Sequence, residues 1–133
     1  MSAVTTRNAE DPGPFLTQAV LAPAGPTLYV SGQCGVDPAT GKCVEGTCAD
    51  RAVQVLKNLE QVLKAADMEL GDIVMAQIYL INHAEDMEPV NEVYMKAFEG
   101  CSPMPARICI GVAALPMGTD VEIACTAVKR SSS

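Results

Sequence analysis

The chain has 133 residues, a length typical of one domain. Its net charge is −7, and lysine and arginine are scattered, which argues against a nucleic-acid-binding protein because such proteins present clustered cations to phosphates. Hydrophobic residues make up 49% of the sequence, and no apolar run approaches membrane-spanning length. We therefore expect one well-packed domain over residues 1–133 without a transmembrane helix.

Neither end of the sequence shows a recognisable targeting signal. Residues 1–15 are polar and then rich in Pro and Gly, so we expect an N-terminal arm, and residues 131–133 form a short tail. No signal peptide is evident, and acidic residues in the arm suit a transit peptide poorly. We expect a cytoplasmic protein, with a mitochondrial location left open.

Six cysteines are present, but the sequence lacks the secretory context in which an even number implies disulfides. A metal site is also not expected, because there is no C-x-x-C pair and His83 is the only histidine. We therefore expect reduced, mostly structural thiols and no bound metal.

The first half of the chain predicts two strands and a helix. Residues 16–22 and 27–36 are rich in strand formers and are separated by the turn signal "PAGP", so they could pair or lie side by side. Thr47 is a plausible N-cap, and Asp50 completes a capping box. A helical apolar face follows, widened by further valines: Ala52, Val53, Leu56, Leu59, Val62, Leu63 and Ala66.

The second half predicts a strand, a helix and two closing strands. Residues 73–81 are almost continuously apolar, as in a strand buried on both faces. A helix is expected over 85–99, with Pro89 in its first turn, where a missing N–H costs least. Strands are expected over 106–115 and 120–130. The predicted fold class is α+β, with two helices on one face of a mixed sheet and an uncovered opposite face that favours oligomerisation.

Two charged residues, Arg107 and Glu122, interrupt the closing strands. Arg107 could be a surface residue at a strand end, or a clamp whose planar guanidinium binds a carboxylate. Glu122 could protect a sheet edge against aggregation, or act as a base that positions water. Alternation places Arg107 on the same side of its strand as Cys109. It places Glu122 and Ile123 on different sides of theirs.

The geometry of a simple hairpin would keep these charges apart. If "PMGT" closes such a hairpin, Glu122 lies opposite Ala113, about 13 Å along the strand from Cys109 and farther from Arg107. A compact site that uses both charges would then need strand curvature or a second chain. We therefore expect a cleft between subunits.

Three motifs resemble the RidA family, also called endoribonuclease L-PSP (YjgF/UK114). They are "SGQCGVDPATG" at 31–41, "PVNEVYMKAF" at 89–98 and "PARICIGVAALPMGTDVEIA" at 105–124. The third is the family signature, and together the motifs extend the resemblance over nearly the whole chain. The resemblance implies a chorismate-mutase-like α+β fold with a mixed sheet of about six strands, assembled as a homotrimer with a site at each subunit interface.

The resemblance also implies an activity. Family members hydrolyse reactive 2-enamine and 2-imino acids, such as 2-aminoacrylate and 2-iminopropanoate, to 2-oxo acids and ammonia, without a cofactor. By motif, Arg107 would bind the substrate carboxylate, Glu122 would orient or activate the attacking water, and Cys109 would line the site. The partners implied are a small imino or enamino acid and further copies of the chain, with no membrane and no nucleic acid.

Further polar positions match the family's site. Ser31 and Asn91 correspond to site residues, and Gly32 offers a bare backbone to a small ligand. From the residues alone, Ser31 could be an ordinary strand residue and Asn91 an exposed helix residue. Phe15 departs from the pattern, because family members often carry tyrosine there, and phenylalanine lacks the hydroxyl. This departure puts one hydrogen bond in doubt and could weaken or redirect activity.

Two other functions stay open at this stage. One is a non-catalytic module that binds small carboxylates and regulates another process. The other is a ribonuclease or translation inhibitor, as the family's second name suggests. The acidic composition and the lack of a pair of histidines for acid–base catalysis count against that ribonuclease.

Overall fold

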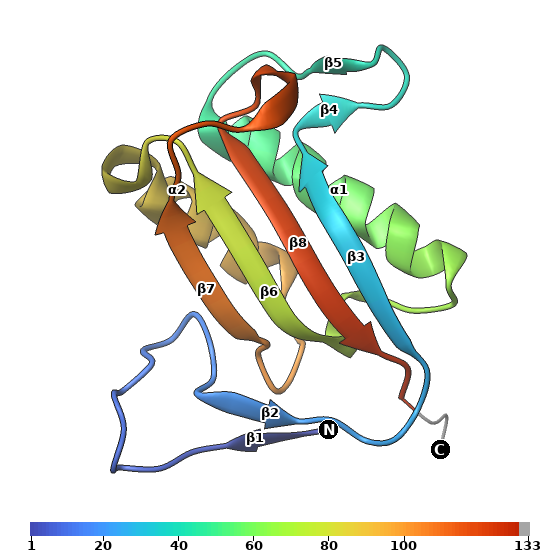
Figure 1. Ribbon diagram of the computed structural model, residues 1–133, viewed down its shortest axis with the longest axis vertical. Helices are drawn as coiled ribbons and strands as arrows, with labels where there is room; N and C mark the ends of the chain where they lie inside the picture. Colours follow the sequence, from blue (N-terminus) through green and yellow to red (C-terminus); the bar gives the residue numbers. More distant parts are fainter. Residues whose placement is uncertain (131–133) are drawn as a thin grey trace.

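Two helices cover one face of a four-stranded sheet in the computed structural model, which describes residues 1–130 (Figure 1). The strands lie in the order β3 (Thr27–Cys34), β8 (Val121–Val128), β6 (Ile73–Leu80) and β7 (Ala106–Gly111). β6 and β7 are parallel, and the other neighbours are antiparallel. The α+β class and the mixed sheet are thus confirmed, but the main sheet has four strands rather than about six.

The remaining strands form two small two-stranded sheets, and the first differs from what the sequence suggested for residues 1–15 and 16–22. Residues 16–22 could have paired with residues 27–36 or lain beside them, yet β2 (Ala19–Leu21) pairs with β1 (Ser2–Val4), inside the segment expected to be an arm. β1 supplies the hydrogen-bonding partners that an isolated three-residue strand lacks. The second small sheet consists of β4 (Val36–Asp37) and β5 (Lys42–Cys43). The predicted tail, 131–133, lies outside the described residues.

The hairpin considered for the closing strands does not form. β7 and β8 are not neighbours, because β6 lies between them and pairs with both. β7 runs parallel to β6, so the segment after β7 must cross the end of β6 before β8 begins (Figure 1). Glu122 therefore lies opposite Tyr79 of β6 and Cys34 of β3, and not opposite Ala113.

Helix α1 (Cys48–Ala65) begins where the sequence predicts. The Thr47 hydroxyl accepts a hydrogen bond from the Asp50 backbone N–H, and the Asp50 carboxylate accepts one from the Thr47 N–H. These two bonds satisfy donors that a helix start leaves unpaired. The predicted apolar face is buried at Ala52, Leu56, Leu59 and Leu63, whereas Val53 and Val62 stay exposed and Val55 is buried in their place.

Helix α2 (His83–Ala97) begins two residues earlier than expected. The Asn82 carbonyl already accepts hydrogen bonds from the N–H groups of Glu85 and Asp86, which closes the first turn ahead of Pro89. Pro89 therefore lies inside the helix rather than in its first turn. Val90, Asn91, Tyr94 and Phe98 form the buried side of the segment.

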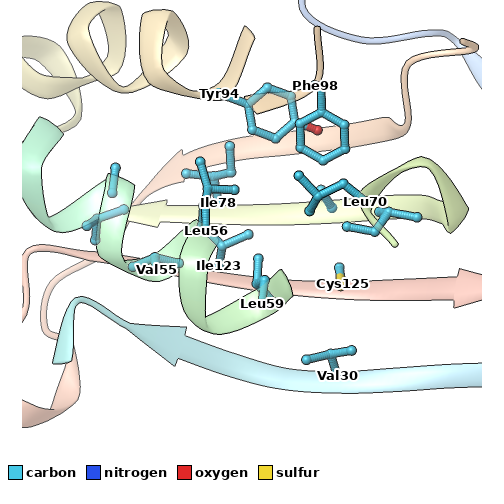
Figure 2. Packing of buried hydrophobic residues seen from close by; sticks show 14 of the residues in the cluster. Val30, Val55, Leu56, Leu59, Leu70, Ile78, Tyr94, Phe98, Ile123 and Cys125 are labelled. Atoms are coloured by element: carbon cyan, nitrogen blue, oxygen red, sulfur yellow. The ribbon is translucent and has the colours of Figure 1, made fainter. Parts of the chain in front are cut away.

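The core lies between the two helices and the sheet (Figure 2). It is built from α1 leucines, the alternate residues Ile78 and Ile123, and the rings of Tyr94 and Phe98, whose centroids are 4.5 Å apart. The opposite side of the sheet, here called the open face, carries no helix. Large apolar side chains are exposed on it: Tyr29 at 80%, Ile108 at 45% and Ile110 at 42%.

All six cysteines are free thiols. Within residues 1–130, no helix is both long and apolar enough to cross a membrane.

An ion pair joins the start of β8 to helix α1. The Arg51 guanidinium donates from Nε to Asp120 Oδ1 at 2.6 Å and from Nη2 to Oδ2 at 2.8 Å. The same guanidinium donates to the carbonyl groups of Val44 and Gly46, so it also fixes the loop before α1. The hydrogen bonds from Arg51 hold the pKa of Asp120 below its ordinary value, against the opposing effect of burial.

We expect Asp120→Asn to lower the free energy of unfolding at pH 7 by about 1–2 kcal/mol, because the paired carboxylate is lost. The folded-state pKa of Asp120 is depressed, so its stabilisation is present above the unfolded-state pKa and is lost as pH falls through the folded-state pKa. The difference between wild type and variant should therefore shrink below about pH 4. Urea unfolding at a series of pH values measures it.

The matched control is Asp67→Asn. Asp67 is 90% exposed and lies 3.9 Å from Lys129, so its loss should change stability little at any pH. A pH-independent difference for Asp120→Asn would contradict the ion-pair interpretation.

Candidate functional site

Arg107 lies on the helix-covered side of β7. In the parallel pairing of β7 with β6, it lies opposite the buried Ala76. Its Nη2 donates to Asn91 Oδ1 at 2.6 Å. Asn91 is only 4% exposed, so the interpretation of this residue as an exposed helix residue is wrong. Arg107 is half-buried, and the alternative of an ordinary surface arginine does not describe its surroundings.

Two aromatic rings flank the Arg107 guanidinium. Its Cζ lies 4.8 Å from the Tyr94 ring centroid and 5.6 Å from that of Phe15, within the range of cation–π attraction. Thr17 anchors the segment that carries Phe15, since its hydroxyl donates to the Met104 carbonyl at 3.0 Å. A residue from the N-terminal segment is thereby brought to the edge strand.

The guanidinium is short of partners. Its Nε and Nη1 are buried without a hydrogen-bond acceptor, and no carboxylate within residues 1–130 forms an ion pair with it. Burial lowers the pKa of Arg107 from its ordinary value. A buried cation without an anion is costly, so this arrangement suits a group that receives its anion from outside the chain.

Cys109 lies on the same side of β7 as Arg107, two residues further on. Burial raises the pKa of its thiol, and the Arg107 charge acts in the opposite direction. His83 Nε2 lies 3.2 Å from the Cys109 carbonyl oxygen, which fixes the strand backbone at this point. We call Phe15, Asn91, Tyr94, Arg107 and Cys109 the arginine half-site.

Glu122 lies on the open face, away from Arg107. The thiol of Cys34 donates to its Oε1 at 3.5 Å. A Cβ placed on Gly32 would lie 2.6 Å from the Glu122 carboxyl carbon, so only glycine lets the carboxylate rest against β3. The pairing of β3 with β8 shifts by one residue at Ser31 and Gly32, as in a β-bulge. Ser31 is exposed. We call Ser31, Gly32, Cys34 and Glu122 the glutamate half-site.

The two half-sites cannot meet within one chain. Arg107 of β7 pairs with Ala76 of β6, and Glu122 of β8 pairs with Tyr79 of β6. The two charged side chains lie on opposite faces of the sheet. Strand spacing and rise separate their Cα atoms by about 14 Å. The sequence-predicted residues thus fall into two groups, each internally compact.

Sequence reasoning missed two members of these groups. The sequence motifs gave neither Tyr94 nor Cys34 a role at a site. Nothing in the sequence shows that the Tyr94 ring faces Arg107, since that contact depends on how α2 crosses β7. The Cys34 contact depends on the register of β3 against β8.

A separate group could in principle hold a cation. Within the described residues, ligand atoms of Cys48, Asp86 and Asp120 lie within 4.8 Å of one another. Arg51 already occupies both oxygens of Asp120, which neutralises the strongest ligand of this set. No metal is needed to explain the cluster.

The mixed sheet with both helices on one face places the chain in the α+β class. The sequence model described as Endoribonuclease L-PSP matches residues 7–129. The chain therefore belongs to this family, as the resemblance indicated.

Named relatives agree with the assignment. The chain is 41% identical to the human 2-iminobutanoate/2-iminopropanoate deaminase, over 88% of this chain and 81% of the human protein. It is 41% identical to the RutC family protein UK114 of Drosophila melanogaster, over 96% of this chain and 89% of that protein.

Solved structures share the fold. A Rid family protein of Yersinia pestis has a TM-score of 0.85 and 30% identity, covering 96% of this chain and 97% of that chain. TdcF of E. coli, solved with bound serine, has a TM-score of 0.74 and 30% identity, covering 98% of this chain and all of that chain.

We expect Arg107→Met to leave the free energy of unfolding within about 1 kcal/mol of wild type, or to raise it, because a buried cation without an anion is removed. Urea unfolding measures the change. A loss of several kcal/mol would instead show that Arg107 is a structural residue. Tyr94→Ala is the contrasting variant, because removing this fully buried ring should cost about 3–5 kcal/mol.

Proposed function

We propose that this protein hydrolyses reactive 2-imino acids and their enamine tautomers to 2-oxo acids and ammonia. The observation that carries the proposal is the Arg107 guanidinium, half-buried and flanked by aromatic rings, with two nitrogen atoms lacking partners. Mammalian relatives at 41–44% identity are named 2-iminobutanoate/2-iminopropanoate deaminase, which supports this reaction class.

In this proposal Arg107 binds the substrate carboxylate. Charge-assisted hydrogen bonds from a planar guanidinium fix both the position and the orientation of a carboxylate. Asn91 accepts from Nη2 and the two rings flank the group, so the guanidinium is pre-organised before substrate arrives. The bound serine of TdcF, which has a carboxylate of the same kind, is consistent with this class of ligand.

In this proposal Glu122 activates the attacking water as a general base. Its carboxylate accepts a proton from the water molecule whose oxygen attacks the imine carbon, and it returns the proton to the nitrogen. The hydroxyl proton of the resulting carbinolamine then passes to nitrogen, and the carbon–oxygen double bond forms as the carbon–nitrogen bond breaks, which yields the 2-oxo acid and ammonia with no change of oxidation state. Water and the imino acid are the only reactants, so the reaction as proposed needs no cofactor.

The complete site is proposed to form between subunits. The arginine half-site of one chain would face the glutamate half-site of the next, in a homotrimer whose sheets turn their open faces inward. The exposed Tyr29, Ile108 and Ile110 on the open face support burial in an assembly. The separation of Arg107 from Glu122 by strand β6 supports a site built from two chains.

A coupled assay tests the reaction. A serine or threonine dehydratase generates the imino acid in place, and ammonia or 2-oxo acid release is followed with and without this protein. Wild type should accelerate release, Arg107→Ala should lower kcat/KM at least about 100-fold because carboxylate binding is lost, and Glu122→Gln should lower kcat. Equal rates for Arg107→Ala and wild type would refute the mechanism.

The same assay separates the alternatives. A carboxylate-binding module without catalysis predicts binding of a 2-oxo acid by calorimetry, dependent on Arg107, with no acceleration. Phe15 in place of the family's tyrosine is the feature that favours this second function. A ribonuclease would have to cleave RNA in a highly purified preparation and lose that activity in Glu122→Gln.

Mixed assemblies test the shared site. Arg107→Ala and Glu122→Gln chains are each expected to be inactive alone. When they are unfolded, mixed in equal amounts and refolded, we expect about a quarter of wild-type activity, because one interface in four joins two intact half-sites. Absence of recovery, with mixed oligomers verified by mass spectrometry, would show that each site lies within one chain.

A further inference from the structure

Cys34 touches the proposed water-handling group, but neither the sequence motifs nor the relatives' names give it a role. Its Sγ lies 3.5 Å from Glu122 Oε1, and the geometry is that of a thiol donating to a carboxylate. The two residues are directly opposite each other in the pairing of β3 with β8. The contact is thus set by sheet register and does not depend on a flexible loop.

The backbone of Cys34 is anchored from the other side of the sheet. Asn58 of α1 donates from Nδ2 to the carbonyl groups of Cys34 and Val36, at 3.2 and 2.9 Å. Gln54 in turn donates to Asn58 Oδ1 at 2.9 Å, which fixes the amide orientation. The end of β3, where the thiol is attached, is therefore tied to the helix layer.

Gly32 makes room for the same carboxylate on another side. A Cβ built on Gly32 would lie 2.8 Å from Glu122 Oε2, so this oxygen rests directly over bare backbone. The thiol occupies Oε1 and the glycine leaves room at Oε2. The hydrogen bond from Cys34 is therefore the contact that holds Oε1, while Oε2 lies beside the bare backbone of Gly32.

The thiol keeps its proton at neutral pH. Burial, followed by the hydrogen bond to Glu122, raises the pKa of Cys34 to about 11. A thiol in this state is a poor nucleophile but can still donate a hydrogen bond. This argues for a donor and against a covalent role for Cys34.

We infer that Cys34 is a positioning residue, whose thiol holds Glu122 Oε1 so that Oε2 is directed at the attacking water. The inference rests on the proposed function. It assigns Cys34 no contact with the substrate, and it predicts an effect on the chemical step rather than on carboxylate binding.

The experiment compares Cys34→Ala and Cys34→Ser in the coupled assay. Loss of the donor in Cys34→Ala should lower kcat about tenfold and leave KM within about twofold, because a hydrogen bond to a charged group is lost while the arginine half-site is intact. Cys34→Ser restores a donor and should recover kcat to within about threefold of wild type. Cys101→Ala removes another half-buried thiol, whose charged neighbours are Glu69 and Arg130, and should match wild type.

Each outcome decides the inference. Wild-type kcat in Cys34→Ala, or a raised KM with unchanged kcat, would overturn it. A serine variant as slow as the alanine variant would also overturn it, since donation would then not be the cause. A crystal structure of Cys34→Ala with Glu122 unmoved would do the same. Failure of the proposed function is distinguishable, because wild type itself would then not accelerate ammonia release.

Discussion

β6 lies between β7 and β8, and this strand order keeps Arg107 and Glu122 apart. β6 pairs in parallel with one neighbour and antiparallel with the other, so the two closing strands never touch. Because side chains alternate across a strand, this arrangement sends Arg107 toward the helices and Glu122 to the open face. One chain therefore presents two half-sites on opposite sides of a sheet.

The arginine half-site combines features that oppose stability. A cation is desolvated beside Tyr94 and Phe15, and the structure offers it one amide oxygen but no carboxylate within residues 1–130. Residues that reduce stability are expected where a ligand completes the interactions. The packing beneath, from Tyr94 through Phe98 to the α1 leucines, is close enough to hold this arrangement in place.

The sequence was informative where local chemistry decides structure. The Thr47–Asp50 capping box set the start of α1, and helical periodicity found most of its buried face. Local signals failed where partners come from afar. Residues 16–22 could have paired with β3 or lain beside it, but β2 pairs with β1. The "PMGT" segment was compatible with a simple hairpin, but β6 separates its flanking strands. Strand pairing is a long-range choice that turn residues alone do not specify.

The same division holds for the site. The motifs were enough to predict the family and to select Arg107, Glu122, Gly32 and Asn91 as candidates. Alternation predicted which side of its own strand each charge takes, and both signals are local properties of the chain. Local patterns could not show that Tyr94 faces the guanidinium, that Asn91 is buried or that Cys34 contacts Glu122. These contacts join α2 to β7 and β3 to β8, and they exist only because packing and register bring distant segments together.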